Sequence, residues 1–262
     1  MITALYRHRM MFVAVVLFFG ALAQLRTQTP TPCTPDCPET PFLTTTYIVN
    51  VSAPPPWQSC IMAVKYVKRK ACGIWNDIQV LSITFPGAAC QGLQNWLNDP
   101  NVSSASKALL MGQAHNIASL GVISTEFLNM YNNATPSEQQ ALECPGGSSI
   151  WRASKGSCWF IDSDCWHTEM KPCPNSACCL HEFSLCMNQG VIEYTLTSTI
   201  VPSTPCGNPE NPGRCAYYGE DGKCYFQCDN DGLEEVINKI KSGDIDMGLA
   251  NQVSPESTTS QQ

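Results

Sequence analysis

The cysteines constrain the fold of this chain more than any other feature of its sequence. The chain has 262 residues and 16 cysteines, the first of which is Cys33. A large, even set of cysteines in an exported protein is typical of a disulfide framework, because thiols pair in an oxidising compartment. We therefore predict disulfide bonds at Cys33, Cys37, Cys60, Cys72, Cys90, Cys144, Cys158, Cys165, Cys173, Cys178, Cys179, Cys186, Cys206, Cys215, Cys224 and Cys228.

Zinc binding is the competing interpretation of these cysteines. Cys33 and Cys37 are separated by three residues, and so are Cys224 and Cys228, which makes each pair a conceivable half site. Structural zinc sites usually combine two closely spaced pairs of Cys or His ligands. This sequence has no paired CxxC motifs and its histidines are scattered. Disulfides are therefore favoured, and we predict no metal ligand and no cofactor.

The number of cysteines also restricts how they pair. Five cysteines precede residues 91–143, a stretch that contains none. Five is an odd number, so at least one of them must pair beyond this stretch if no thiol is free and no bridge joins two chains. Cys144 lies just past the stretch and is the nearest candidate.

The N-terminus predicts export. Arg7 and Arg9 precede an apolar run over residues 11–19, and Ala21 and Ala23 place small residues at the −3 and −1 positions of a cleavage site. This arrangement is typical of a cleavable signal peptide over residues 1–23. The apolar run is shorter than the roughly 20 residues that a membrane-spanning helix needs. We expect a secreted or cell-surface protein, cleaved after Ala23, with no membrane span once the signal is removed.

The charge of the chain excludes several partners. Charged residues make up only 14% of the sequence, and the formal net charge is −7. Removal of Arg7 and Arg9 with the signal peptide would lower the net charge to −9. Nucleic acid requires a basic face, and attachment to anionic lipid requires basic clusters. We therefore expect no nucleic-acid partner.

The N-terminal third of the mature chain is predicted to be extended. Residues 24–41 form a Pro/Thr-rich leader, a composition that favours extended backbone. Residues 42–90 form a β segment with alternating or β-branched runs at Thr44–Ser52, Cys60–Lys70 and Asp77–Phe85. The last two runs flank a short Cys-Gly turn, which predicts a hairpin.

Residues 91–143 are predicted to be helical. From Ser103 to Tyr131 apolar residues recur at three- and four-residue steps, which indicates one buried helical face. Gly121 is a point at which this helix could divide in two. A second helix is expected from Thr135 to about Glu143, because a capping threonine is followed by proline and then by a glutamate.

Residues 144–241 are predicted to form a cysteine-rich β segment with a C-terminal helix, followed by a flexible tail over residues 242–262. Two short strands are expected within Ser148–Ile161, around Lys155-Gly156. The strongest signal is a hairpin over Cys179–Val201 with Gln189-Gly190 as its turn. The apolar pattern sets its register, pairing Met187 with Ile192, Leu185 with Tyr194, Phe183 with Leu196, His181 with Ser198 and Cys179 with Ile200.

These segments together predict an α+β protein. It consists mainly of antiparallel β hairpins, with a helical insert at about 91–143, a short C-terminal helix and many disulfides.

No catalytic residue can be selected from the sequence. His181 and Glu182 follow a cysteine pair, but adjacent residues on a strand point to opposite faces and cannot act as a dyad. His115 has no acidic residue within a helical turn and is expected on a polar helix face. Asp162, Asp164 and His167 lack a metal-binding spacing. Residues 227–238 lack the first aspartate and the final glutamate of a calcium loop. Trp151, Trp159 and Trp166, near Cys158 and Cys165, are more typical of a core that covers disulfides than of a ligand platform.

Several motifs together resemble a known group of proteins. They are Thr31-Pro32-Cys33 with Cys37-Pro38, Cys60 at the start of a strand, Ala71-Cys72, Asn76-Asp77-Ile78-Gln79, Ala177-Cys178-Cys179 and Cys224-Tyr225-Phe226-Gln227-Cys228-Asp229. Over residues 33–90 and 173–229 the chain resembles exported, cysteine-rich bacterial proteins with no assigned biochemical function. The resemblance implies export and a surface or secreted role, and it implies no catalytic residue.

Two classes of function follow from the sequence. The favoured one is a secreted, disulfide-stabilised extracellular or cell-surface protein with a structural, adhesive or recognition role. Its partner would be another copy of itself or a molecule at the surface. The alternative is a secreted hydrolase with a site near residues 158–186, where a cleft would have to gather His167, His181 and several acids.

Overall fold

The computed structural model describes residues 37, 40–163, 168–173, 177–201, 206, 225–226, 228, 230–245 and 254–255. The predicted signal peptide and nearly all of the leader lie outside these residues. Within them, no helix is both long enough and apolar enough to cross a membrane.

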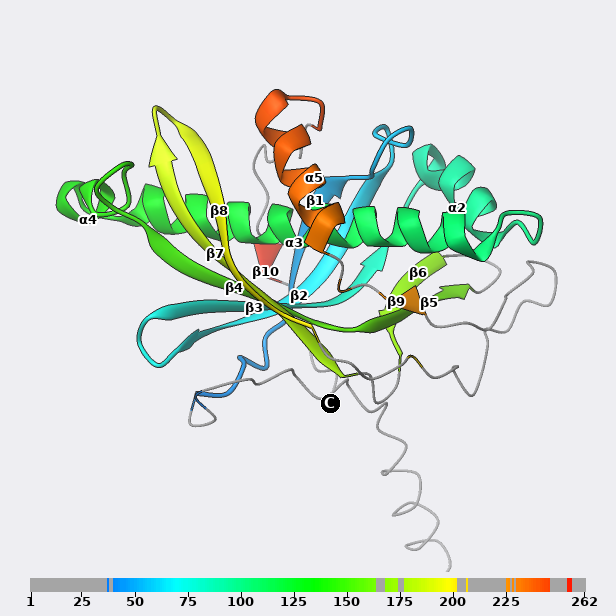
Figure 1. Ribbon diagram of the computed structural model, residues 1–262, viewed down its shortest axis with the longest axis horizontal. Coiled ribbons are helices and arrows are strands. Elements are labelled where there is room, and N and C mark those ends of the chain that lie inside the picture. Colours follow the sequence, from blue (N-terminus) through cyan, green and yellow to red (C-terminus); the bar gives the residue numbers. More distant parts are fainter. Residues whose placement is uncertain are drawn as a thin grey trace, which may run out of the picture. The chain divides into compact units, whose positions relative to one another are not determined.

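The described residues form ten strands and a small set of helices (Figure 1). The strands are β1 (Tyr47–Ser52), β2 (Ile61–Ala71), β3 (Trp75–Thr84), β4 (Ser149–Gly156), β5 (Cys158–Ser163), β6 (Thr168–Pro172), β7 (Cys178–Asn188), β8 (Val191–Ile200), β9 (Tyr225–Phe226) and β10 (Ser254–Pro255). The helices are the 3-10 turn η1 (Ala88–Cys90), α2 (Gln91–Asn98), α3 (Ser104–Asn133), α4 (Pro136–Gln140) and α5 (Asn230–Ser242).

All ten strands belong to one mixed sheet, which curves around α3 (Figure 1). Its main order is β10-β1-β2-β3-β4-β7-β8, and β5, β6 and β9 branch from this path. The expected hairpins β2–β3 and β7–β8 are present, but β3 and β4 pair in parallel. A parallel pair needs a long crossover, and here the segment containing α2, α3 and α4 supplies it. The prediction of an α+β protein is confirmed, whereas antiparallel hairpins describe only part of the sheet.

Helix α3 lies at the centre of the hydrophobic core. Every residue from Ala114 to Phe127 is buried, although the sequence predicted one buried face. The sheet covers one side of the helix and α5 packs against it as well. His115 is therefore 0% exposed, and its predicted place on a polar helix face is wrong.

Gly121 does not divide α3, which runs without interruption from Ser104 to Asn133. A Cβ atom added at Gly121 would lie 2.6 Å from Cγ2 of Val51 on β1. The glycine thus lets the helix backbone approach the sheet closely. The predicted helix starts are confirmed, because the Ser103 hydroxyl accepts a bond from the Ser106 amide and Thr135 forms a capping box. Helix α4 is shorter than predicted and ends at Gln140.

The β7–β8 hairpin has the predicted two-residue turn, with positive φ at Gln189 and Gly190. The three predicted pairs nearest the turn are confirmed: Met187 with Ile192, Leu185 with Tyr194, and Phe183 with Leu196. Beyond them the register is wrong, because a bulge at Glu182/Phe183 shifts the pairing by one residue. His181 therefore faces Thr199 rather than Ser198, and Ile200 faces Leu180 and is 54% exposed.

Five disulfides connect described cysteines. They are Cys37–Cys72, Cys60–Cys90, Cys144–Cys186, Cys158–Cys206 and Cys179–Cys228. No free thiol occurs among the described residues. The chain is thus disulfide-rich. Cys144 bonds to a later cysteine, so the suggestion that it pairs with one of the first five is wrong. Of those five only Cys33 lies outside the described residues.

The remaining predicted strands and the last helix are present with shifted boundaries. Strands β4 and β5 meet near Gly156 as expected, but they pair with different neighbours rather than with each other. Of the predicted strand near the C-terminus, β9 retains two residues. Helix α5 buries Leu233, Val236 and Ile237 and is followed by Gly243 with a φ of 81°.

Candidate functional site

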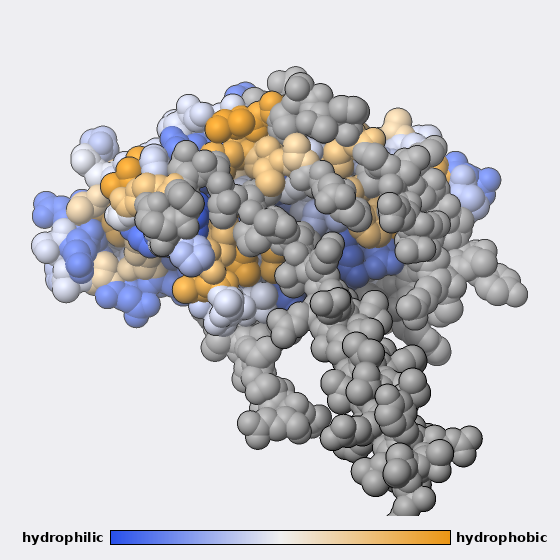
Figure 2. Space-filling model, turned by 90° about the horizontal axis from the view of Figure 1, so that it is seen from below, coloured by the Kyte–Doolittle hydropathy of each residue, from blue (hydrophilic) through white to orange (hydrophobic). Residues whose placement is uncertain are grey.

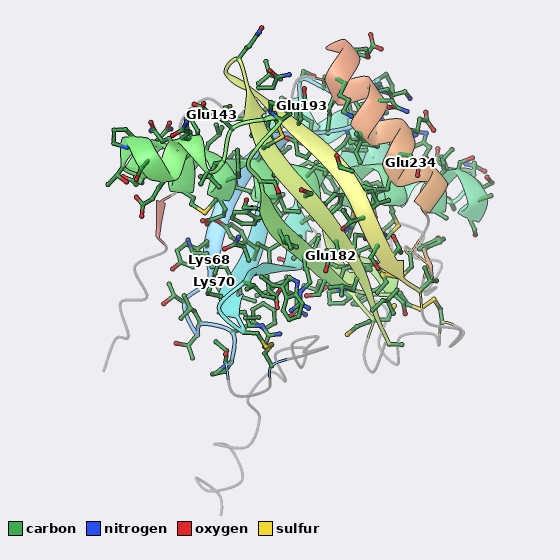
Figure 3. All side chains as sticks on the ribbon, turned by 60° about the vertical axis from the view of Figure 1, so that its left-hand side comes forward. Lys68, Lys70, Glu143, Glu182, Glu193 and Glu234 are labelled. Carbon is green, nitrogen blue, oxygen red and sulfur yellow. A yellow bond between two sulfur atoms is a disulfide. The ribbon has the colours of Figure 1, made fainter. Side chains whose placement is uncertain are left out.

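A cavity of about 440 Å³ lies between the β2–β3 hairpin, the start of β4 and the C-terminal half of α3. Its wall combines basic, acidic and amide side chains with a few apolar ones. The lining residues are Leu43, Lys68, Arg69, Lys70, Asn76, Asp77, Glu126, Asn129, Met130, Asn133 and Trp151. Figure 3 shows Lys68 and Lys70 close together near the end of β2.

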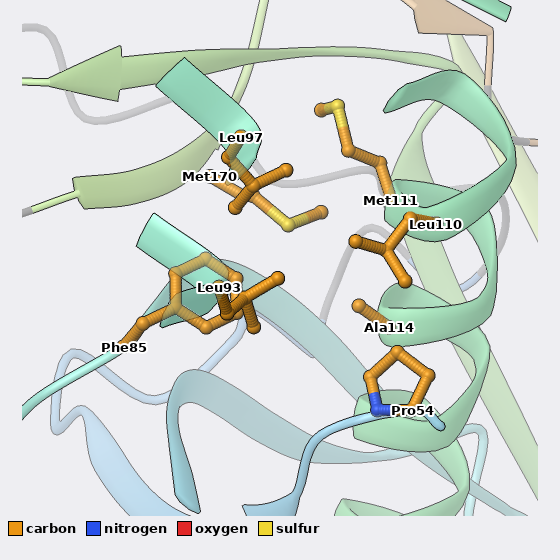
Figure 4. Close-up of a pocket in the computed structure, with 8 residues that line it drawn as sticks. All are labelled: Pro54, Phe85, Leu93, Leu97, Leu110, Met111, Ala114 and Met170. Carbon is orange, nitrogen blue, oxygen red and sulfur yellow. The ribbon is translucent and has the colours of Figure 1, made fainter. Parts of the chain in front are cut away.

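Two other cavities are poor candidates for a ligand site. The first, shown in Figure 4, is lined only by apolar residues such as Phe85, Leu93 and Met111, and it has no room for a water molecule. It is part of the packed core where α2 meets α3. The second measures about 100 Å³ and lies between the Pro54-Pro55 segment, α3 and α5. We therefore treat the 440 Å³ cavity as the candidate site.

Glu126 on α3 holds one of the basic side chains of the cavity. Lys68 Nζ lies 2.9 Å from Oε1 and 2.8 Å from Oε2 of Glu126, and the Tyr66 hydroxyl donates to Oε1 at 2.6 Å. Burial, together with the neighbouring carboxylate, raises the pKa of Tyr66 far above its usual value. Tyr66 thus remains a neutral donor. Because both carboxylate oxygens of Glu126 bind Lys68, we assign Glu126 a structural role.

Asp77 holds two more basic side chains in a row across three strands. The carboxylate is 3% exposed and accepts bonds from Arg69 Nε at 2.8 Å and from Arg152 Nε at 2.6 Å. Arg69 also donates to the backbone carbonyls of Cys37 and Thr40. Direct pairing of Arg69, Asp77 and Arg152 in the sheet places these groups side by side. Glu182 on β7 pairs directly with Arg152, so the row continues as two cations and two anions and carries no net charge.

Lys70 differs from the other basic residues of the cavity, because its hydrogen bonds go to neutral acceptors. Its Nζ lies 3.1 Å from Asn76 Oδ1 and 3.4 Å from the carbonyl of Ile74. The side chain is exposed at the end of β2, two residues beyond Lys68 and on the same face of the strand. Lys70 can therefore offer its charge to a ligand without first breaking an ion pair.

Two asparagines of α3 add hydrogen-bonding capacity. The Asn129 side chain makes no hydrogen bond to any residue that the structure describes, and it is half-buried in the cavity wall. Asn133 donates from Nδ2 to the carbonyl of Asn129 at 2.7 Å. An amide side chain can donate and accept at once. The cavity thus presents a cation and amide groups that are not fully used by the protein.

The histidine cluster is closed, in contrast to this cavity. His115 Nδ1 lies 3.3 Å from the Ser119 hydroxyl, and the ring meets Trp159 edge to face at 4.4 Å. Burial, then the nearby charge of Lys155 and the proximity of His181, lower the pKa of His115 well below its usual value. Lys155 Nζ donates to Asn116 Oδ1 at 3.2 Å. This histidine is neutral and enclosed, its Nε2 has no hydrogen-bond partner among the described residues, and it offers no surface to a substrate.

The residues predicted for the alternative hydrolase site do not come together at any of these three cavities. His181 is 2% exposed, and Asp162 forms an ion pair with Lys171 at 2.7 Å. Neither His181 nor Asp162 lines any of the three cavities. Asp164, His167 and Trp166 lie outside the described residues, as does Asp229 of the rejected calcium loop. Trp151 and Trp159 are buried, as predicted for core residues.

One group of possible metal ligands occurs among the described residues, and it does not fit a metal ion. Sulfur atoms of Cys144 and Cys186 lie within 4.8 Å of a Glu193 oxygen. The two cysteines are bonded to each other, so neither can supply the thiolate that a metal would need.

Sequence reasoning missed the residues of the cavity. A signal was present, since residues 65–70 hold four of the 15 basic residues of the chain: Lys65, Lys68, Arg69 and Lys70. Asn129 and Asn133 come from a distant helix, and no local pattern joins them to this basic stretch.

Comparison of the chain with models of known protein families, with curated proteins and with solved structures finds no match. The site is therefore interpreted from its own geometry.

Proposed function

We propose that this protein is an extracellular recognition protein, and that the 440 Å³ cavity binds a small polar ligand. The observation that carries the proposal is the combination of a ligand-sized cavity with polar groups, Lys70 and Asn129, that the protein uses only in part or not at all. Ligand sites in proteins commonly measure about 300–1,000 Å³ and contain a few convergent polar groups. The cavity falls in this range.

The disulfides support this proposal because they fix the strands that form the cavity. Cys60–Cys90 ties the start of β2 to the segment after β3, and Cys37–Cys72 ties the β2–β3 turn to the segment before β1. Binding groups on a rigid frame lose little entropy when a ligand binds. A framework that holds Lys70 and Asn76 in place suits recognition.

The predicted export agrees with the same proposal. Disulfides persist in oxidising compartments, and the signal-peptide pattern over residues 1–23 would direct the chain there. The resemblance to exported, cysteine-rich bacterial proteins also favours a secreted or surface location, without indicating an activity. On the face seen in Figure 2, apolar patches alternate with hydrophilic ones where described residues are visible. We place recognition in the cavity because partly used polar groups line it.

The proposal can be tested by ligand-observed NMR with a panel of sugars, amino acids and small organic acids. We expect at least one class of compound to bind wild-type protein and to lose binding in Asn129→Phe, which fills the cavity from α3. Asn132→Phe is the matched control, because Asn132 is an exposed neighbour on the same helix and does not line the cavity.

The two variants give clear alternatives. Binding that survives Asn129→Phe would place the ligand elsewhere, and absence of any binding to wild-type protein would contradict a recognition role for the cavity. The unchanged near-UV circular dichroism of both variants would show that they remain folded.

A further inference from the structure

We infer that the ligand of the cavity is an acidic sugar, a ring that carries one carboxylate and several hydroxyl groups. The inference rests on the proposed function and specifies its ligand class. Three features of the cavity support it: a cation bonded only to neutral groups, a set of amides and an apolar wall.

The charge balance favours an anion. The cavity is lined by Lys68, Arg69 and Lys70 against Asp77 and Glu126, a balance of one positive charge. The carboxylates of Asp77 and Glu126 accept hydrogen bonds from these cations, so neither would repel an anionic ligand as a free charge. The local charge is positive on a chain whose net charge is −7. A negative ligand would be attracted to this end of the molecule.

Lys70 is the group that would meet the carboxylate. Lys68 is held by both oxygens of Glu126, with its side chain 31% exposed. Lys70 is exposed, and its bonds within the described part of the chain go only to neutral oxygens. A carboxylate is a stronger partner for an ammonium group than an amide or backbone carbonyl, because the hydrogen bond is charge-assisted. Because Lys70 is the one cation of the lining without an acidic partner among the described residues, we expect one carboxylate on the ligand.

The amides favour hydroxyl groups as the rest of the ligand. Asn76, Asn129 and Asn133 all line the cavity. A sugar hydroxyl donates and accepts, and a side-chain amide can meet both needs. Asn76 is bonded to Lys70 and to the carbonyl of Ile150, so Asn129 is the amide most available to a ligand, and acetate has no hydroxyl group to meet it.

The remaining wall is apolar and suits the C–H face of a sugar ring. Met130 and Leu43 supply this wall, and Leu43 is 50% exposed, whereas Trp151, which also lines the cavity, is only 5% exposed. A ring with hydroxyls at its edge and C–H groups on its face would place its edge toward the asparagines and its face against this wall.

The test is to titrate the mature full chain with three probes and to measure binding by isothermal titration calorimetry or by NMR. The probes are methyl β-glucuronoside, the matched neutral methyl β-glucoside, and acetate. We expect the glucuronoside to bind about tenfold more tightly than either of the others. Lys70→Gln should weaken glucuronoside binding about tenfold and leave glucoside binding unchanged. Lys241→Gln, which removes an exposed charge on α5, is the matched control and should have no effect.

Each other outcome overturns the inference in a distinguishable way. Equal binding of glucoside and glucuronoside would show that the carboxylate is not recognised, while the proposed function stands. Equal binding of acetate and glucuronoside would show that the sugar ring is not recognised. If none of the three probes binds but another compound of the panel does, and Asn129→Phe abolishes that binding, the ligand class is wrong and the cavity remains the site. Failure of every compound would contradict both proposals.

Discussion

Two polar regions lie beneath α3, and they differ in how the fold treats them. Around His115, in the middle of the helix, the polar groups are enclosed between α3 and the sheet, and His115 is 0% exposed. Around Lys70, near the end of the helix, polar groups line an open cavity. The sealed region lies where β4 and β7 cross the centre of the sheet, and the open one lies where the β2–β3 hairpin ends.

Polar residues in a core are therefore not by themselves evidence of a site. Buried polar groups are costly unless they are paired, and most of those under α3 are satisfied within the protein. Ser124 and Tyr194 bond to each other, and Lys155 bonds to Asn116. What marks the cavity is the combination of access with side chains, such as Lys70 and Asn129, that are only partly used.

The largest effect is expected at the floor of the cavity, at Asp77. Asp77→Ala would leave Arg69 and Arg152 buried without the carboxylate that neutralises them. Breaking a buried ion pair from one side costs about 3–5 kcal/mol. We expect a decrease of this size in the free energy of unfolding, measured by urea denaturation with the disulfides intact.

A stability loss below about 1 kcal/mol for Asp77→Ala would contradict the structural role of Asp77 in neutralising the two arginines. It would indicate that the arginines reach solvent and are free to bind a ligand, which would remove the distinction drawn between them and Lys70. Asp162→Ala is the control, since Asp162 forms its ion pair with Lys171 at a partly exposed position. Its loss should be small, about 1 kcal/mol or less.

Gly121 separates the sealed region from the open one along α3, and its replacement should have the next largest effect. Alanine is favoured over glycine in a helix by about 1 kcal/mol. The added methyl group, however, would lie 2.6 Å from Val51 Cγ2, so the helix or β1 must move. Overpacking of a core costs about 1–3 kcal/mol. Gly121→Ala should therefore destabilise the protein, and Val51→Ala should partly rescue it, as a double-mutant cycle would show.

Local patterns predict much of this fold. The β2–β3 and β7–β8 hairpins follow from alternation and from turn residues such as Gly190, whose positive φ the turn requires. Helix caps at Ser103 and Thr135 are predictable because capping depends on a few adjacent residues. These features have in common that the interactions that determine them lie close together in the sequence.

Features set by distant contacts could not be predicted in the same way. The parallel pairing of β3 with β4 joins residues such as Asp77 and Arg152, which are far apart in the chain. The bulge at Glu182/Phe183 leaves Thr197 as an extra residue on β8 and reverses the faces of the β8 residues beyond it, and apolar alternation gave no sign of it. An amphipathic pattern predicts an exposed face for His115, because it says nothing about a sheet that curves around the helix. The candidate site was missed for the same reason, since it joins a basic strand end to a helix about 60 residues later.

His115 provides a test of the sealed region through pH. Its pKa in the folded protein lies well below 6.5, chiefly because of burial and also because of Lys155 and His181, whereas in the unfolded chain it returns to about 6.5. Below pH 6.5 the unfolded state therefore binds the proton more readily. Folding stability contributed by the neutral histidine is present above pH 6.5 and decreases as the pH falls below it.

In His115→Leu this part of the acid dependence should disappear. We expect the variant to lose less stability than wild-type protein between about pH 6.5 and pH 5, as measured by thermal unfolding at each pH. At about pH 7 and above the histidine is neutral in both states, so the pH dependence of the two proteins should coincide. Parallel curves throughout the acid range would show that water reaches His115 and that the region is not sealed.

The smallest effect should come from Lys70, and its neighbour Lys68 is the matched reference. The two lysines lie two residues apart on one face of β2, and both line the cavity. Lys68→Met would remove the cation from Glu126, whose side chain is 7% exposed, and leave it with the Tyr66 hydroxyl. Loss of a hydrogen-bonded partner at such a site should cost about 1–3 kcal/mol. Lys70→Met would remove only bonds to the exposed Asn76 and to a carbonyl, so its effect should remain within about 0.5 kcal/mol. Urea denaturation of the two variants side by side measures the difference. Equal losses would mean that Lys70 contributes as much to the fold as Lys68 does, and the cavity would then have no cation to offer a ligand.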